Sequence, residues 1–278
     1  MPQHEDNPEL YRLLNIADPD APIYRIFPLW FFEEFLRLRQ LVLVLPASWE
    51  DPFEVLPESI LLQDRRPTPW SQHSLEPLLT AAYAQCWSQT EESDTLIRAY
   101  SRVVKDSHFS RNTDPRSEGV RVRTTPKKLL RAVLNWARNL DGVECYIGAV
   151  LYKSRDQLKQ YLANMIAQHT PDTIGHRQPR AELLLVKRMA FAHEAEVRLI
   201  CVDHRGVGSN GLVRIPVDPP DLIEEVTFDP RLESFERIER EKLAKSLGYT
   251  GTFGASDLYQ RTVLLVPMPD GWAEFYSQ

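Results

Sequence analysis

Two glutamates and one arginine occupy alternate positions in the stretch FAHEAEVRLI, which runs from Phe191 to Ile200. Side chains of an extended chain point alternately to the two faces of a sheet. The spacing therefore predicts a strand over residues 191–202 with Glu194, Glu196 and Arg198 on one face and small or apolar residues on the other. The apolar face packs in a core, and the charged face can serve catalysis, ligand binding or an ion pair.

The bulk composition indicates a soluble globular protein of the cytoplasm. The chain has 278 residues, 43% of them hydrophobic and 26% charged, and a formal net charge of −6. This balance lacks the positive field on which non-specific duplex binding relies. The first residues are polar and acidic, and no stretch approaches the ~20 apolar residues of a membrane span. Cys86, Cys145 and Cys201 are far apart in apolar surroundings, so we expect reduced buried thiols.

Hydrophobic periodicity and capping residues divide the chain into elements. A polar leader is expected over residues 1–21 and a single domain over residues 22–278. Predicted strands lie at 22–27, 41–45, 86–88, 119–125, 143–152, 191–202, 211–217 (as hairpin partner of the preceding strand), 222–228 and 261–267. Predicted helices begin after Pro28, at 75–84, after Ser93 or Asp94, at Pro126, after Ser154, at 180–188 and at 231–247.

The order of these elements decides the fold class. Helices and strands mix without the strict alternation of a doubly wound protein. The sequence therefore predicts an α+β fold, a single domain with a mixed or antiparallel sheet flanked by helices.

Several signatures in chain order resemble the bacterial domain-of-unknown-function family 2971. They include LVLVLPASWEDPFE, CWSQTEESDTLIRAYS, CYIGAVLY, KRMAFAHEAEVRLI and IEEVTFDP, and they extend over about residues 22–259. The strongest are the D-P-F-E tetrapeptide at 51–54 and the K…F…E.E.R run from Lys187 to Arg198. The chain departs from the family at Glu50 and Ile97. Since the family has no settled activity, this resemblance implies a fold and little chemistry.

A second resemblance lies inside the first. ADP-ribosyltransferases similar to arginine-modifying toxins carry, in order, an arginine on their first strand, a serine on a later strand and a Glu-x-Glu pair. Arg25 in IYRIF, Ser88 in CWSQT, and Glu194 with Glu196 in HEAEV follow that order. The resemblance implies an ADP-ribosyltransferase-like fold, NAD as co-substrate, and a role as a defence or toxin effector.

The same resemblance implies a role for each residue. Glu196 would hold the nicotinamide-side ribose and stabilise positive charge as nicotinamide leaves, while Ser88 steadies that carboxylate. Glu194 would orient or deprotonate a protein or nucleic-acid acceptor. Arg25 would engage the diphosphate, and we place Tyr24 and Arg198 with it on the cofactor-binding side.

Each of these residues also has a structural interpretation. Glu196 can pair with Arg198 as strand charges commonly do. Ser88 can be a turn hydroxyl, and Arg25 a rim residue whose stem lies along apolar neighbours. With those interpretations the chain would be a non-catalytic binding or sensing module.

Three further features of the sequence can carry function. Asp51, Glu54, Glu194 and Glu196 can bind magnesium in a metal-dependent nuclease if they meet, but Arg198 stands where such sites place a lysine, so we expect no metal. His193 is a candidate base, but as one of seven scattered histidines we expect it to face solvent at the start of a strand. The basic run from Arg121 to Arg131 is either a phosphate or nucleic-acid contact or a solvated face.

Overall fold

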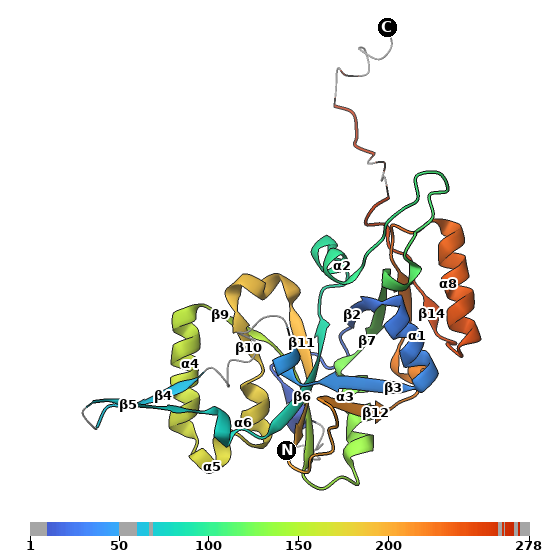
Figure 1. Cartoon of the computed structure of the whole chain (residues 1–278). Coiled ribbons are helices and arrows are strands. Elements are labelled where there is room, and N and C mark those ends of the chain that lie inside the picture. The colour runs from blue at the N-terminus through green and yellow to red at the C-terminus, as the bar shows by residue number, and fades with distance from the viewer. Residues whose placement is uncertain are drawn as a thin grey trace, which may run out of the picture.

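A large mixed sheet is the central feature of the computed structural model, which describes residues 10–49, 60–66, 69–260, 263, 265–269 and 272. Among these residues ten strands join in one sheet, whose main path is β1-β8-β11-β6-β2-β7-β13-β14. In addition, β12 pairs with β3, and β3 pairs with β6. Figure 1 shows this sheet in the middle of the molecule with helices around it. The predicted α+β fold with a mixed sheet flanked by helices is thus confirmed.

Most neighbouring strands of the sheet are antiparallel, and only β1 with β8 and β13 with β14 run parallel among the described pairs of this sheet. Two small two-stranded sheets, β10-β9 and β4-β5, lie outside it. The strands are β1 (Leu13–Leu14), β2 (Ile23–Pro28), β3 (Gln40–Val44), β4 (Leu61–Asp64), β5 (Ser71–Ser74), β6 (Ala81–Ser88), β7 (Gly119–Thr124), β8 (Val143–Ala149), β9 (Leu151–Lys153), β10 (Val186–Arg188), β11 (Glu196–Asp203), β12 (Leu212–Pro216), β13 (Glu225–Phe228) and β14 (Thr252–Phe253).

The predicted caps begin three of the helices. The Ser93 and Thr125 side chains accept hydrogen bonds from the backbone of the first turns of α2 and α3, and Ser154 forms a capping box with Gln157 at the start of α4. Such caps satisfy backbone N–H groups that have no partner inside the helix. The helices are α1 (Leu29–Leu38), α2 (Asp94–Tyr100), α3 (Pro126–Ala137), α4 (Arg155–Gln168), α5 (Pro171–Ile174), α6 (Arg177–Glu182), α7 (Pro219–Leu222) and α8 (Ser234–Ser246).

The core covers both faces of β11. Val197, Leu199 and Cys201 pack in a cluster with apolar residues of α1 and α3, whereas Ile200 and Val202 pack on the opposite face in a cluster that includes α6 and the residues after it. Every residue of β11 is buried as a result. Glu196 and Arg198 alternate with the first group and so lie on the second face. The charged face of this strand is therefore inside the protein.

Three predicted elements differ in the structure. Residues 75–84 form a short 3-10 turn followed by β6 instead of a helix. Residues 180–188 contain the end of α6, the buried run at 183–186 and β10. In both places the apolar residues form short runs, whose spacing does not distinguish a strand from a helix. The strand over residues 191–202 begins only at Glu196, because a 3-10 turn extends over Met189–Glu194.

The predicted hairpin between residues 191–202 and 211–217 is also wrong. β11 already has β6 on one edge and β8 on the other, so β12 pairs with β3 instead. At the C-terminal end, Val263 and residues 265–269 lie outside any strand, and the rest of the predicted strand at 261–267 lies outside the described residues.

The expected burial is confirmed for two of the three cysteines: Cys145 and Cys201 are buried, whereas Cys86 is partly buried, and all three are free. No helix in the described ranges is long and apolar enough to cross a membrane. β1 joins the sheet from within the segment expected as a leader, and the division into a leader and one domain stays a prediction.

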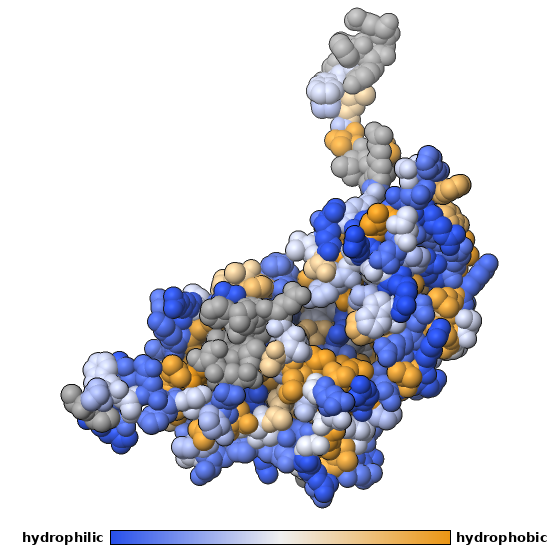
Figure 2. All heavy atoms as spheres, in the orientation of Figure 1, coloured by the Kyte–Doolittle hydropathy of each residue, from blue (hydrophilic) through white to orange (hydrophobic). Residues whose placement is uncertain are grey.

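Figure 2 shows hydrophilic side chains over most of one face, with apolar groups in separate patches, one of them over β3 and β6.

Candidate functional site

Three of the predicted site residues stand side by side on neighbouring strands. Ser88 on β6 is paired with Glu196 on β11 across one edge of its strand and with Tyr24 on β2 across the other. Directly opposed residues of antiparallel strands project to the same face. The sheet therefore brings Tyr24, Ser88 and Glu196 into one row, although 172 residues separate the outer two in the sequence (196 − 24).

Glu196 lies between two cations. Lys187 Nζ donates to its Oε1 at 2.5 Å, and Arg198 Nε donates to its Oε2 at 2.8 Å. The Glu196 backbone N–H donates to the hydroxyl of Tyr152 on β9 at 2.8 Å. Only 6% of the Glu196 side chain is exposed. Each carboxylate oxygen has about two acceptor positions, so the two cations do not use all of them.

Glu194 reaches the same cluster by a different route from the one expected. It ends the 3-10 turn, and Ala195 after it has the left-handed conformation, with φ of 43°. This turn lets both glutamates face Lys187, whose Nζ donates to Glu194 Oε2 at 2.6 Å. A non-glycine residue with positive φ is strained by roughly 1 kcal/mol. The two carboxyl groups also share a hydrogen bond.

The two carboxyl groups differ strongly in acidity. Burial and the neighbouring Glu196 raise the pKa of Glu194 to about 7, against the opposing effect of Lys187. Burial also opposes ionisation of Glu196, but the charge of Arg198 and the hydrogen bonds from Glu194 and Arg198 outweigh it and lower the pKa to about 2. Adjacent carboxyl groups with separated pKa values commonly divide the roles of proton acceptor and permanent anion.

Ser88 positions the backbone beside this pair. Its hydroxyl donates to the carbonyl oxygen of Glu194 at 2.7 Å and accepts from the backbone N–H of Thr90 at 3.0 Å. Gln89 N–H donates to the carbonyl oxygen of Ala195. Ser88 thus holds the strained turn rather than the Glu196 carboxylate directly.

Arg25 lies in a fork of the sheet. The edge of β6 facing away from β11 pairs with β3 at Ala84 and with β2 at Ser88, so it has no strand partner at Cys86 between them. Arg25 Nη1 donates to the Cys86 carbonyl oxygen at 3.3 Å. Side chains alternate between the two faces along β2, so the Cβ of Arg25 points to the face opposite that of Tyr24 and Glu196. The Arg25 guanidinium reaches the fork between the strands, at the Cys86 carbonyl.

The Arg25 guanidinium has no carboxylate partner among the described residues. Its contacts are the Cys86 carbonyl and the ring of Phe27, whose centroid is 5.8 Å away. Burial lowers the pKa of Arg25, while interactions with Cys86 and Tyr100 raise it. A desolvated guanidinium held by one carbonyl retains several N–H donors for an anion.

Tyr100, at the end of α2, interacts electrostatically with groups of the fork and with both carboxylates. Burial raises the pKa of its phenol, with contributions from Cys86, Glu194 and Glu196 that also raise it and an opposing one from Arg25. The Tyr100 hydroxyl is therefore within electrostatic range of Arg25 and of both glutamates.

The remaining two residues expected on the cofactor side are buried. The ring of Tyr24 packs under the Arg121 guanidinium, 5.4 Å from its centroid, and burial and Glu91 raise the pKa of its phenol. Arg198 is fully buried; besides Glu196 it donates to the Leu184 carbonyl oxygen at 2.8 Å and lies over the Trp49 ring. The expected ion pair between Glu196 and Arg198 is thus present.

Sequence reasoning missed Lys187, Tyr152 and Tyr100. Lys187 stands at the start of the K…F…E.E.R run, but nothing in the spacing shows that a residue nine positions before Glu196 contacts it. β10 pairs in parallel with β9 and aligns Lys187 with Tyr152. This long-range pairing brings both side chains to the carboxylates.

The alternative sites find less support. Within the described ranges no group of three or more histidine, cysteine, aspartate or glutamate residues could hold a metal ion, and Asp51 and Glu54 lie outside those ranges. His193 is exposed at the end of its turn. In the basic run, Lys127 and Lys128 pair with Asp20 and Glu224, and Arg123 pairs with Glu224 and Glu225. These acids neutralise much of its charge.

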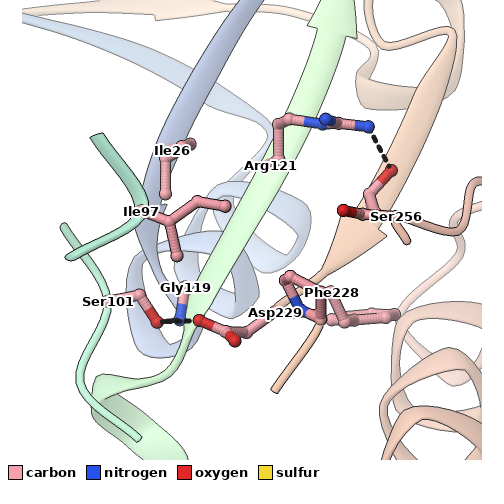
Figure 3. A pocket seen from close by; sticks show the side chains of 10 residues that line it. Ile26, Ile97, Ser101, Gly119, Arg121, Phe228, Asp229 and Ser256 are labelled. Carbon is pink, nitrogen blue, oxygen red and sulfur yellow. Dashed lines mark hydrogen bonds between the residues drawn. The ribbon is translucent and has the colours of Figure 1, made fainter. Parts of the chain in front are cut away.

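A cavity on the Tyr24 side of β2 and β7 is small. Figure 3 shows Ser101 and Asp229 pointing toward each other in its wall. Ser101 Oγ donates to Asp229 Oδ2 at 2.5 Å and accepts from Gly119 N–H at 2.6 Å. The cavity volume is about 20 Å³, room for about one water molecule, so it does not accommodate a substrate.

No protein-family model matches the sequence, and no curated protein matches it. The resemblance to domain-of-unknown-function family 2971 therefore stays a prediction. Solved structures of DarT from Thermus sp. 2.9 match the chain. The one in complex with ADP-ribosylated ssDNA is 12% identical, with 87% of this chain and 97% of that chain covered and a TM-score of 0.37. Those with carba-NAD+ and NAD+ are 12% and 13% identical, cover 86% of this chain and 97% and 98% of those chains, and have TM-scores of 0.35 and 0.34.

Proposed function

We propose that this chain is an ADP-ribosyltransferase-like enzyme that uses NAD and acts on a protein or nucleic-acid nucleophile. The observation that carries the proposal is the Glu194–Glu196 pair beside Ser88 and the fork that holds Arg25. Its two carboxyl groups have different protonation states near neutral pH. Carboxyl groups with strongly shifted pKa values are more common at functional sites than elsewhere.

NAD fits the charges of this cluster as a co-substrate, since it carries an anionic diphosphate and, on its nicotinamide-side ribose, a carbon that becomes electron-poor as the glycosidic bond breaks. Arg25 supplies N–H donors for the diphosphate. Glu196 stays ionised throughout the neutral range and stabilises the positive charge that develops on the ribose.

Glu194 supplies the second chemical step. Its pKa of about 7 suits a general base at neutral pH, because such a group is partly deprotonated and still able to take a proton. It removes the proton of the acceptor nucleophile as that atom bonds to the ribose carbon, and nicotinamide leaves with the electrons of the broken bond. The Ser88 hydroxyl holds the Glu194 backbone in place by donating to the Glu194 carbonyl oxygen.

Arg25 gives a direct test of NAD binding. A ligand that binds only the folded state raises the melting temperature. We expect millimolar NAD to raise the melting temperature of the wild type and to have a much smaller effect on Arg25→Gln. Arg37→Gln is the matched control, because Arg37 is an exposed residue of α1 that pairs with Glu33. Equal shifts in all three proteins, or none in the wild type, would contradict the proposal.

A second function, a non-catalytic binding module, is favoured by one observation. Two cations neutralise Glu196, and most of its surface is buried, as in a purely structural ion-pair network. Such a module can bind NAD but releases no nicotinamide, so turnover separates the two functions. Toxicity on expression that disappears in Glu196→Gln would support the effector role.

A further inference from the structure

The ammonium of Lys187 lies between the two carboxyl groups of the candidate site. Its Nζ donates to Glu194 Oε2 at 2.6 Å and to Glu196 Oε1 at 2.5 Å. Only 4% of the Lys187 side chain is exposed. The face of the Phe191 ring lies 4.5 Å from the same nitrogen. This lysine is therefore fixed against both carboxyl groups and is shielded from water.

The position of Lys187 is set by backbone pairing. β10 and β9 run parallel with Lys187 opposite Tyr152, and the Tyr152 hydroxyl accepts the N–H of Glu196. The start of β11 is thus held from the side of Tyr152 and from the side of Lys187. A lysine anchored in this way keeps its ammonium at one point, and the two carboxyl groups must orient around it.

The charge of Lys187 acts on both carboxyl groups in the same direction. An opposite charge within hydrogen-bonding distance favours the ionised form. Lys187 lowers the pKa of both glutamates. Arg198 also donates to Glu196, whereas Lys187 both donates to Glu194 and lowers its pKa. Loss of the ammonium should therefore raise the pKa of Glu194.

Other groups surround the pair and do not supply the same contact. Arg25 lies in the fork on β2, and Tyr100 stands at the end of α2. The titratable and charged groups that act on the two carboxyl groups come from α2, β9, β10 and β11, and they are Tyr100, Tyr152, Lys187 and Arg198.

We propose that Lys187 is a positioning residue that orients Glu194 and Glu196 and sets the pH range in which Glu194 can take the proton of the nucleophile; this inference rests on the proposed function. Lys187 does not touch the reacting atoms. It acts by holding Glu194 Oε2 and Glu196 Oε1, while Arg198 holds the other oxygen of Glu196.

The test is a titration of Glu194 in the full chain without NAD. Glutamate side-chain carboxyl carbons are labelled with carbon-13, their NMR shifts are followed against pH, and the Glu194 signal is assigned by its loss in Glu194→Gln. The wild type should titrate near pH 7, following the pKa of about 7. Lys187→Met should raise the midpoint by about one pH unit or more, and Lys187→Arg should restore it to near the wild-type value.

The matched control is Lys153→Met on the neighbouring strand. Lys153 lies over the Tyr161 ring and should leave the midpoint unchanged. Lys187→Gln, which removes the charge but keeps a hydrogen-bond donor, replaces Lys187→Met if the latter does not fold. An unchanged midpoint in the neutral variant, or the same rise in Lys153→Met, would overturn the inference.

Turnover distinguishes this inference from the proposed function. If the midpoint rises as expected, the acid limb of the rate of nicotinamide release should move to higher pH by the same amount in Lys187→Met. If Lys187→Met shifts the Glu194 midpoint but the wild type never cleaves NAD, the proposed function is overturned, and with it the catalytic part of the inference. Cleavage with an unshifted titration would overturn the inference alone.

Discussion

Lys187 and Glu196, from strands β10 and β11, are joined by a hydrogen bond of 2.5 Å between Nζ and Oε1. Arg198 binds the other carboxylate oxygen of Glu196. Breaking a buried ion pair from one side leaves an uncompensated charge in a medium that solvates it poorly. The stability of the fold should therefore be sensitive to the loss of Lys187, Glu196 or Arg198.

Arg198→Met should destabilise the fold strongly. The substitution keeps most of the side-chain volume but removes the donors to Glu196 and to the Leu184 carbonyl. We expect a loss of about 3–5 kcal/mol in the free energy of unfolding, measured by urea denaturation. Arg37→Met should cost less than about 1 kcal/mol, because Arg37 is an exposed helix residue whose ion pair with Glu33 lies at the surface. Similar losses for both variants would show that the buried network does not stabilise the fold.

The pH dependence of stability should carry a signature of Glu194. Its folded pKa of about 7 lies above the ordinary glutamate value of 4.5, so the folded state binds the proton more tightly. The resulting stability is fully present below about pH 4.5 and is lost as the pH rises through about 7. Glu196, with its pKa lowered to about 2, behaves oppositely and loses its contribution only as the pH falls from about 4.5 toward 2.

Comparison with Glu194→Gln isolates the first effect. Between about pH 5 and pH 8 the wild type should lose at most about 3 kcal/mol relative to that variant. Chemical denaturation at a series of pH values measures the difference. Parallel stability curves for the two proteins would contradict a raised Glu194 pKa.

Ala195→Gly should stabilise the turn between the two glutamates. Ala195 has φ of 43°, where a side chain is strained and glycine is not. We expect a gain of about 0.5–1 kcal/mol in the free energy of unfolding. Ala163→Gly, an exposed position within α4, should instead cost about 1 kcal/mol. A loss at both positions would mean that the turn is not strained.

The placement of the candidate residues could be predicted from the sequence only in part. The resemblance to ADP-ribosyltransferases nominated Ser88 and Glu196, and the structure pairs them directly on β6 and β11. Alternation also put Glu196 and Arg198 on one face correctly. It misplaced Glu194, because alanine at position 195 gives no signal of the left-handed conformation that ends the turn.

Lys187 and the fork at Arg25 depend on contacts between distant segments. Lys187 reaches the carboxylates only because β10 pairs with β9, and the fork exists because β2 and β3 share one edge of β6. The periodicity of a single segment contains no information on such pairing. The same limit explains residues 75–84, where an apolar run that is central in the sheet was assigned to a helix.

Nicotinamide release from NAD tests the central claim most directly. Purified wild type, Glu196→Gln and the control Glu33→Gln are incubated with NAD, and free nicotinamide is measured chromatographically over time. We expect release by the wild type and by Glu33→Gln, and a loss of at least about 100-fold in Glu196→Gln, because the substitution removes the permanent anion. Equal release by the wild type and a folded Glu196→Gln, or none by the wild type, would contradict the central claim.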